Sequence, residues 1–481
     1  MSETQYSTVL VGTGFASSFF LAKHLTHAKA SDRILVLERG ARDSHKWQVE
    51  HRAASSTPVH PTFRKEGDPS KDWVFTLGFG GGSNCWWACT PRMLPNDFRM
   101  HSLYGVGRDW PVSYDELEPW YQTAEEMMAI AGPNDGSPYP RSKPYVQPAH
   151  KLSDPDKILK RAYPNHVFSQ PTARASKPMR GRGMCCANGV CTVCPANAKF
   201  TIDNGLRHIY ADPRVTVRLG ASVESLEYAG NTVNGVRFSE AGNSQRVSAD
   251  LVVLGANAIF NPLIMMRSGL ADPLLGKRLH EQLSVLVDVD LDGVDNFQGS
   301  TVITSLSYMF YDGDHRRERA ACMIEGWNKP TLMRPENGKW RQSARYKLIF
   351  EDLPDDGNCV KLDPSSPNRP ILYFKGHSDY AHRSIDVLES QIVSKFLRAL
   401  PVERIYYNKA IASTEAHIIG TTVMGNSAKD SVIDRGLAHH HLRNLLVLGS
   451  GAFPTCSPAN PSLTISALSL WAASRLSSST T

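Results

Sequence analysis

The stretch STVLVGTGFASSFFLAKHL, residues 7–25, constrains the fold of this chain more than any other. Its β-branched, apolar residues at 8–11 predict a short strand, and the pattern over 16–25 predicts a helix. Gly12 permits a tight turn between them, Gly14 lets the backbone approach a pyrophosphate, and the helix N-terminus supplies unpaired N–H groups. The motif therefore predicts a dinucleotide-binding turn, with Phe15 and Ala16 beside the ligand.

The next segment, RILVLERG (33–40), predicts a second buried strand that ends at Glu38. An acidic residue at this place accepts hydrogen bonds from ribose hydroxyls in dinucleotide-binding folds. Ser17 replaces the third glycine of the motif and is small enough for the helix to pack closely on the strand. The alternative is a strand–helix turn that binds nothing, but strand, turn, helix, strand and acid in this order favour binding.

Two later segments indicate that the nucleotide-binding domain is discontinuous. DLVVLGANAIFNPLIMMRSG (250–269) predicts a strand, a turn of small residues and a helix, and NLLVLGSGAFPT (444–455) predicts another strand with a glycine turn. Strands that return to the nucleotide-binding domain so late in the chain favour FAD over NAD as the bound dinucleotide. We predict an α/β protein with a Rossmann-like FAD-binding domain over 1–282, an inserted mixed-sheet substrate domain over 283–415, and a return to the first domain over 416–481.

Length and charge exclude several function classes. A chain of 481 residues suggests two or more folding units, and a formal charge of +6 without any Lys/Arg-rich run gives no case for nucleic-acid binding. No apolar run is long enough to span a membrane. The N-terminus has no basic segment ahead of an apolar core, so we expect no signal peptide and a cytoplasmic protein. Export to the periplasm together with a partner subunit is the alternative.

Three segments resemble the glucose–methanol–choline (GMC) oxidoreductases, a family of flavoenzymes. GFGGGSNCWWACTPRMLPNDF (78–98) resembles the family's glycine-rich segment beside the flavin. HIIGTTVMGNSAKDSVID (417–434) and GSGAFPTCSPANPSLTISAL (449–468) resemble its C-terminal signature. YGVGRDWPVSYDELEPWY (104–121) and a cysteine loop (183–200) narrow the resemblance to the flavoprotein subunits of gluconate 2-dehydrogenase and of bacterial FAD-dependent glucose dehydrogenase. The resemblance is weakest over 283–415, where substrate choice should lie.

The resemblance implies two active-site residues. Oxidising an alcohol needs a base for the O–H proton and an acceptor for the C–H hydride, and histidine suits the role of the base. The resemblance places His417 at the reacting edge of the flavin and Asn460 at the family's second active-site position. Asn460 and Pro461 also suit the N-cap and first turn of a helix predicted over 461–475, with its positive end toward the flavin. The alternatives are a buried core histidine and a plain helix cap.

The resemblance also implies a set of flavin contacts. In some relatives a histidine of the glycine-rich segment links covalently to the flavin, whereas Trp86 stands at that position here, so we expect non-covalent FAD. Further contacts are expected from the glycine-rich segment, the later strands and the C-terminal signature: Gly81, Gly82, Ser83, Asn84, Trp86, Val223, Ala256, Gly451, Ala452 and Pro461.

The loop GMCCANGVCTVCPANAKF (183–200) holds four of the chain's nine cysteines: Cys185, Cys186, Cys191 and Cys194. Disulfides, a structural zinc site and inert buried thiols are three interpretations. The dense C-x4-C-x2-C-P spacing favours a fourth, an iron–sulfur cluster. The glucose dehydrogenase relatives carry a 3Fe–4S cluster in such a loop, and the resemblance implies the same here. Three ligands would hold 3Fe–4S and four could hold 4Fe–4S.

These features predict an FAD-dependent dehydrogenase for a small alcohol, namely a sugar, sugar acid or related polyol. Its electrons would pass through the cluster to a redox partner, such as a small subunit or a cytochrome. Three alternatives remain: an oxidase that uses oxygen, a lyase in which FAD is structural, and a redox-silent binding subunit. The intact His417 and Asn460 argue against the last of these.

Overall fold

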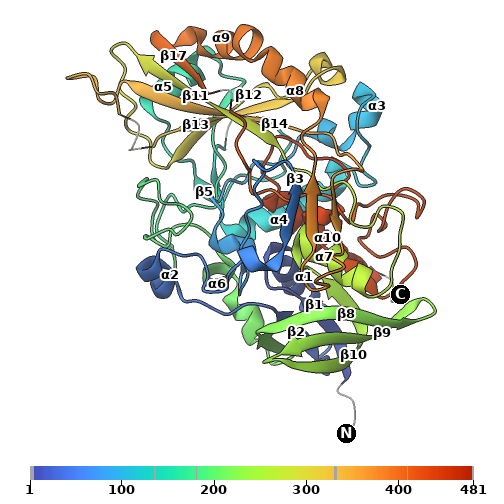
Figure 1. The fold of residues 1–481 in the computed structure, drawn as a ribbon. Coiled ribbons are helices and arrows are strands. Elements are labelled where there is room, and N and C mark those ends of the chain that lie inside the picture. The colour runs from blue at the N-terminus through green and yellow to red at the C-terminus, as the bar shows by residue number, and fades with distance from the viewer. Residues whose placement is uncertain (1–4, 135–136, 180, 330–332, 409, 479–481) are drawn as a thin grey trace.

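Two β-sheets at opposite ends of the molecule organise the fold in this computed structural model (Figure 1). The structure describes residues 5–134, 137–179, 181–329, 333–408 and 410–478. One sheet contains the N-terminal strand, and the other is built mainly from residues between 283 and 408. The segments that connect the sheets fill the middle of the molecule, together with helices α1 (Phe15–His24), α4 (Tyr114–Met128) and α10 (Ser462–Ser478).

The first sheet has seven strands, and five of them are mutually parallel. The carboxyl ends of β1 (Gln5–Val11), β10 (Asn243–Leu254) and β18 (Leu445–Val447) therefore meet at one edge, where open α/β sheets bind their ligands. Strand β10 pairs in parallel with β1 through its second half and antiparallel with β9 through its first half. The strands, in order across the sheet, are β7 (Val215–Leu219), β2 (Ile34–Glu38), β1 (Gln5–Val11), β10 (Asn243–Leu254), β9 (Thr232–Glu240) and β8 (Ala221–Ala229), with β18 (Leu445–Val447) also on β10.

Three helices form the layer beside this sheet. Helix α1 (Phe15–His24) packs against α10 (Ser462–Ser478), which in turn packs against α4 (Tyr114–Met128). Every residue of α1 from Phe15 to Leu21 is buried, because the helix is enclosed between the sheet and α10. The last helix of the chain thus covers the first one.

The second sheet has six strands, and every pairing in it is antiparallel. The range 283–415 supplies all of its strands except β6. Helix α8 (Asp379–Asp386) and the helical turns up to α9 (Ser394–Phe396) pack on the sheet, where Tyr380 and Phe396 join its core. The strand order is β17 (Val402–Asn408), β11 (Leu283–Leu291), β14 (Ser343–Phe350), β13 (Cys322–Trp327), β12 (Ile303–Phe310) and β6 (Val167–Ser169).

The remaining elements are short and connect the two sheets. A three-stranded sheet of β15 (Cys359–Lys361), β16 (Ile371–Phe374) and β3 (Arg64–Gly67) and a small pair of β4 (Ala131–Gly132) and β5 (Gln147–Pro148) complete the strands. The other helices are α2 (His45–His51), α3 (Met100–Tyr104), α5 (Asp154–Ala162), α6 (Ile202–Gly205) and α7 (Asn257–Arg267). No helix in the described ranges is both long and apolar enough to cross a membrane.

The expected fold class is confirmed. The predicted strand at 8–11 lies in β1, the predicted helix over 16–25 is α1, and the helix expected over 461–475 is α10. The late segments at 250–269 and 444–455 do return to the first sheet, as β10 with α7 and as β18. Hydrophobic runs beside glycine turns carried these predictions because both signals are local.

Candidate active site

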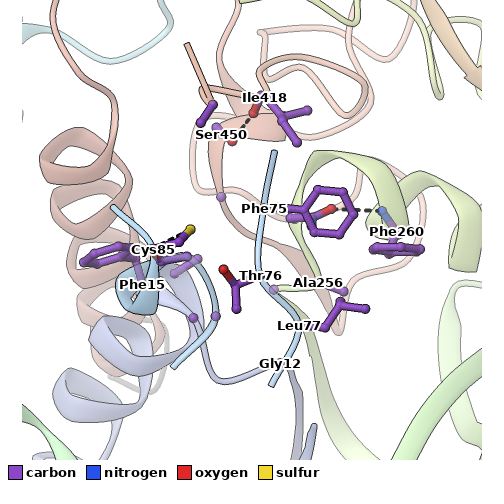
Figure 2. Close-up of a pocket in the computed structure, with 18 of the residues that line it drawn as sticks. Gly12, Phe15, Phe75, Thr76, Leu77, Cys85, Ala256, Phe260, Ile418 and Ser450 are labelled. Carbon is purple, nitrogen blue, oxygen red and sulfur yellow. Dashed lines mark hydrogen bonds between the residues drawn. The ribbon is translucent and has the colours of Figure 1, made fainter. Parts of the chain in front are cut away.

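A cavity of about 820 Å³ lies between the N-terminal turn and the six-stranded sheet, and its size suits a large ligand. Figure 2 shows its wall, with Gly12 and Ala256 near one end and Ile418 and Ser450 near the other. It is lined by most of the residues that the sequence predicts for the flavin and for catalysis: Gly12, Gly14, Phe15, Ala16, Glu38, Gly81, Gly82, Trp86, Val223, Ala256, His417, Asn460 and Pro461.

Four predicted flavin contacts, Ser83, Asn84, Gly451 and Ala452, are not among the lining residues. Ser83 Oγ donates to the carbonyl of Gly80, and Asn84 Nδ2 donates to the carbonyl of Phe79. These side-chain hydrogen bonds stabilise the glycine-rich turn on the side away from the cavity. Gly451 and Ala452 lie in a buried 3₁₀ turn beneath the wall.

The turn after β1 has the geometry of an anion site. Gly12 has φ +88°, and a Cβ placed on it would lie 2.7 Å from the carbonyl oxygen of Gly255, so only glycine fits. A Cβ on Gly14 would meet nothing within 4 Å, which leaves open space beside the N-terminus of α1. No side chain caps that helix end, and its first turn has no acidic residue. Its N–H groups and positive dipole end are available to a pyrophosphate.

Glu38 lines the cavity but is already engaged by the protein. One carboxylate oxygen accepts from the N–H and hydroxyl of Thr13 at 3.1 and 2.7 Å. The other accepts from the N–H groups of Gly40 and Gly78 at 2.9 and 3.2 Å. By these hydrogen bonds Glu38 links the segments at Thr13, Gly40 and Gly78. The ribose contact predicted for Glu38 would add to this structural role.

A strap of residues 73–78 crosses the cavity wall. Figure 2 shows Phe75, Thr76 and Leu77 on one extended segment, between Phe15 on one side and Ala256 with Phe260 on the other. The Phe75 and Phe260 rings meet edge to face at 5.9 Å. Just outside its ends, Asp72 N donates to Ser413 O and Phe79 N donates to Ala41 O, each at 2.9 Å. The strap is irregular in backbone, which is why no strand pattern revealed it.

His417 reaches the cavity from the segment after β17. Its backbone N–H donates to Glu281 Oε2 at 3.2 Å, and its Nδ1 lies 3.1 Å from Gln282 Oε1. Burial lowers the pKa of His417 to about 4, which Glu415 opposes and Lys347 and Lys71 reinforce. The imidazole is therefore neutral near pH 7 and can accept a proton.

Asn460 lies at the start of α10, where Ile465 N donates back to Pro461 O. Its Oδ1 is buried and has no hydrogen-bond partner among the described residues. Buried polar atoms are normally paired, so this oxygen is placed for a ligand. The structure thus brings Asn460 and His417 to one cavity from segments 43 positions apart in the chain.

The six-stranded sheet contributes a polar wall that the sequence analysis did not identify. Glu325 and Trp327 come from β13, and Lys347 comes from β14. Trp327 Nε1 donates to Glu325 Oε2 at 3.0 Å, and Lys347 Nζ pairs with Glu415 Oε2 at 2.7 Å. Burial raises the pKa of Glu325, and Lys347 opposes that shift. A carboxylate within the apolar run CMIEGW was the available signal.

The four cysteines of the loop face one small cavity, next to Arg174 and Lys199. All nine cysteines of the chain are free thiols. Arg174 and Lys199 are buried, and Lys199 Nζ donates only to backbone carbonyls, those of residues 84, 86 and 192. Among the described residues, neither cation has a carboxylate partner. As placed, the described His, Cys, Asp and Glu side chains form no group of three or more that could hold a metal.

The cysteine loop adjoins the main cavity. Trp87 lines that cavity, and its Nε1 donates to Thr192 Oγ1 of the loop at 3.3 Å. Trp87 also packs on Trp327 of the polar wall, with ring centroids 5.3 Å apart. Cys191 and Cys89 share a small apolar cluster with Val302 and Ile303.

Comparisons with known proteins agree with this geometry. Two family models, both described as GMC oxidoreductase, match residues 73–284 and 377–469. The large subunit of fructose dehydrogenase from Gluconobacter japonicus is 30% identical, over 82% of this chain and 79% of that protein. The gluconate 2-dehydrogenase flavoprotein of Pantoea cypripedii is 22% identical, over 97% and 92%. The crystal structure of a pyridoxine 4-oxidase has the same fold, with a TM-score of 0.71 and 17% identity over 98% of this chain and 99% of that one.

Proposed function

Because this chain belongs to the GMC oxidoreductase family, and is therefore an FAD-dependent oxidoreductase of CH–OH groups, we propose that it is a dehydrogenase for a sugar, sugar acid or related polyol. One observation carries the proposal. His417 and Asn460 face the same cavity as the dinucleotide turn at Gly12 and Gly14. A proton acceptor and a cofactor turn in one cavity are what oxidation of an alcohol requires.

The residues around the cavity fit FAD. The N-terminus of α1 and the open space at Gly14 would receive the pyrophosphate, and the wall near Asn460 and Pro461 would receive the ring system. When bound, FAD supplies the acceptor for the hydride that leaves the substrate carbon. Trp86 packs edge to face on Phe15 at 4.6 Å and has no nucleophilic atom for a covalent link, which supports non-covalent binding of the flavin.

His417 takes the hydroxyl proton in this proposal, and Asn460 orients the alcohol oxygen. The neutral state of His417 supports the first role, because a protonated imidazole could not accept a proton. Asn460 lines the cavity, and its side-chain NH2 group can donate a hydrogen bond to the alcohol oxygen, which supports the second role.

The polar wall supports a polyol as substrate. The Glu325 carboxyl and the Lys347 ammonium present an acceptor and donors to neighbouring hydroxyls, while Trp87 and Trp327 present aromatic faces. Sites that bind small polar molecules combine apolar walls with a few convergent polar groups in this way. The names of two relatives, fructose dehydrogenase and gluconate 2-dehydrogenase, point to the same substrate class.

We further propose that the cysteine loop holds an iron–sulfur cluster. Two buried cations without carboxylate partners imply anionic charge in the cavity that Arg174 and Lys199 share with the four thiols. Burial lowers the pKa of Lys199 to about 8, as expected for a buried ammonium that lacks an anionic partner. A cluster supplies a one-electron carrier when bound, next to Trp87 and the main cavity.

The electron acceptor is then a redox protein. One relative is named a large subunit and another a flavoprotein, which supports a partner subunit or cytochrome for this chain as well. Relatives named oxidases support the alternative in which oxygen takes the electrons.

The first experiment uses a panel of polyols with purified holoenzyme and an artificial one-electron acceptor. We expect acceptor reduction without stoichiometric peroxide, and a loss of about 100-fold or more in kcat for His417→Asn at unchanged FAD content. His440→Asn, at a histidine outside the cavity, is the matched control. Peroxide formed in proportion to substrate would establish the oxidase instead, and carbonyl formation by cleavage without flavin bleaching would establish the lyase.

The second experiment measures iron and acid-labile sulfide per FAD in protein purified without oxygen, with EPR before and after dithionite. Three or four irons with a cluster signal are expected. Stoichiometric FAD without iron would refute the cluster and leave the dehydrogenase intact. Cys191→Ser should lose the iron, whereas Cys322→Ser, at a buried thiol in the six-stranded sheet, should retain it.

A further inference from the structure

The buried side-chain amide of Gln282 lies next to His417 and bears on which of its two ring nitrogens carries the hydrogen. Residues 280–282 run antiparallel to residues 417–419, with reciprocal backbone hydrogen bonds between His280 and Ile419 at 3.0 and 2.9 Å. This register places Gln282 directly across from His417. The Gln282 side chain is 2% exposed, so its amide must find partners inside the protein.

The two ends of this amide have different partners. Gln282 Nε2 donates to the carbonyl oxygens of Ser457 at 2.7 Å and Ala459 at 3.2 Å. Both amide hydrogens are thereby used. The opposite orientation would set Oε1 against two carbonyl oxygens, which repel it, so the orientation of the amide is fixed by its surroundings.

Gln282 Oε1 therefore faces His417 Nδ1, at 3.1 Å. An amide oxygen can only accept a hydrogen bond, so Nδ1 must carry the hydrogen. The neutral imidazole has a single ring hydrogen, which leaves a free lone pair on Nε2. Among the described residues, Nε2 has no hydrogen-bond partner of its own.

We infer that Gln282 is a positioning residue: it holds His417 as the Nδ1–H tautomer, so that Nε2 is the atom that accepts the substrate proton. The inference rests on the proposed function and deepens it. The same amide also holds the carbonyl of Ala459, the residue before Asn460. One side chain therefore sets the proton acceptor and anchors the segment that carries the second active-site residue.

The charges around His417 do not perform this task. Glu281 accepts from the His417 backbone N–H and from Lys71, and therefore fixes the main chain and not the ring. Through space, Glu415 raises the pKa of the His417 ring and Lys347 lowers it, and the two residues also pair with each other. None of these groups hydrogen-bonds Nδ1 or Nε2, so in the described structure Gln282 alone selects the tautomer.

The test compares Gln282→Met, which keeps the length of the side chain but cannot hydrogen-bond, with the wild-type holoenzyme. Fixing a ring through a second residue typically contributes about 10- to 100-fold to activity, and we expect kcat to fall by that factor. FAD content should change by less than about twofold, because Gln282 does not line the cavity. Gln147→Met is the matched control, since Gln147 is another buried amide that bridges backbone groups outside the cavity.

The decisive readout is the ¹⁵N spectrum of histidine side chains, with His417 assigned from His417→Asn. The wild-type ring should show protonated Nδ1 and bare Nε2, and Gln282→Met should shift the ring toward the other tautomer. Protonated Nε2 in the wild type, or an unchanged spectrum in Gln282→Met, would overturn the inference. Because the spectrum needs no turnover, it is independent of the substrate panel: failure of every polyol would refute the proposed function and leave this result standing.

Gln282→Glu adds a second outcome. Its carboxylate can still accept from Nδ1 and should raise the pKa of His417, which moves the acid limb of kcat/KM to higher pH. A variant that retains FAD but shows neither this shift nor a loss of kcat would also contradict the role of Gln282.

Discussion

At the scale of single residues, burial and opposed neighbouring charges determine the pKa of the proposed proton acceptor. Burial lowers the pKa of His417 to about 4, Glu415 raises it, and Lys347 and Lys71 lower it further. An unfolded histidine has a pKa near 6.5, so the unfolded chain takes up this proton first as the pH falls. As the pH falls from about 6.5 to about 4, His417 therefore lowers the free energy of unfolding. The activity should persist down to about pH 4, because the folded His417 stays neutral above that value.

Replacement of Lys347 by methionine tests this balance. The change removes a cation and leaves Glu415 without its ion-pair partner, and both effects raise the pKa of His417. The acid limb of kcat/KM should move up by about one pH unit, which corresponds to about 1.4 kcal/mol. Lys375→Met is the control, because Lys375 pairs with Asp355 at the surface. If the acid limb of kcat/KM moved to lower pH in Lys347→Met, or moved equally in both variants, Lys347 would not lower the pKa of His417 as assigned.

At the scale of elements, the dinucleotide turn depends on how closely α1 crosses the ends of β1 and β10. Ser17 Oγ donates to Val11 O at 3.0 Å, and a Cβ on Gly255 would lie 2.0 Å from that hydroxyl. The serine at the third motif position is thus accommodated, as expected, because a glycine stands opposite it. Its partner came from 238 positions further along the chain, which no local pattern reveals.

A double-mutant cycle tests this contact. Gly255→Ala should lower the free energy of unfolding in urea, and the loss should shrink by about 1 kcal/mol in a Ser17→Gly background, because the clashing hydroxyl is gone. Gly12→Ala should show no such rescue, since its Cβ meets the backbone oxygen of Gly255 and its φ is +88°. Equal losses for Gly255→Ala in both backgrounds would show that Ser17 is not the limiting contact.

Local signals therefore predicted the turn, the first helix and the C-terminal segment, while long-range pairing decided the rest. Glu325 and Lys347 face the cavity only because β13 pairs with β14. Gln282 could not be foreseen, since its role depends on the register of residues 280–282 against 417–419. Ser83 and Asn84 belong to the expected glycine-rich segment, yet the tight turn points them away from the cavity.

At the scale of the whole molecule, the cavity belongs to both sheets at once. Gly12 and Val223 reach it from the first sheet, and Glu325 and Lys347 reach it from the second. A ligand that fills the cavity should therefore stabilise both halves together. At free FAD near 100 times its Kd, linkage supplies about 2.7 kcal/mol.

Calorimetry of protein stripped of flavin, with and without added FAD, checks this expectation. Added FAD should raise Tm by several degrees and draw the unfolding of the two sheets into one transition. Adenosine diphosphate, which offers a pyrophosphate without the ring system, should raise Tm less, because it leaves the wall at Asn460 unfilled. Two transitions, with only the first shifted by FAD, would show that the sheets respond independently.

The strap over residues 73–78 bears on how the enzyme is made. It is held in the cavity wall by contacts with residues 41, 260 and 413, so the complete wall forms only after most of the chain has been synthesised. We therefore expect FAD to bind to a nearly complete chain and not to its N-terminal segment alone.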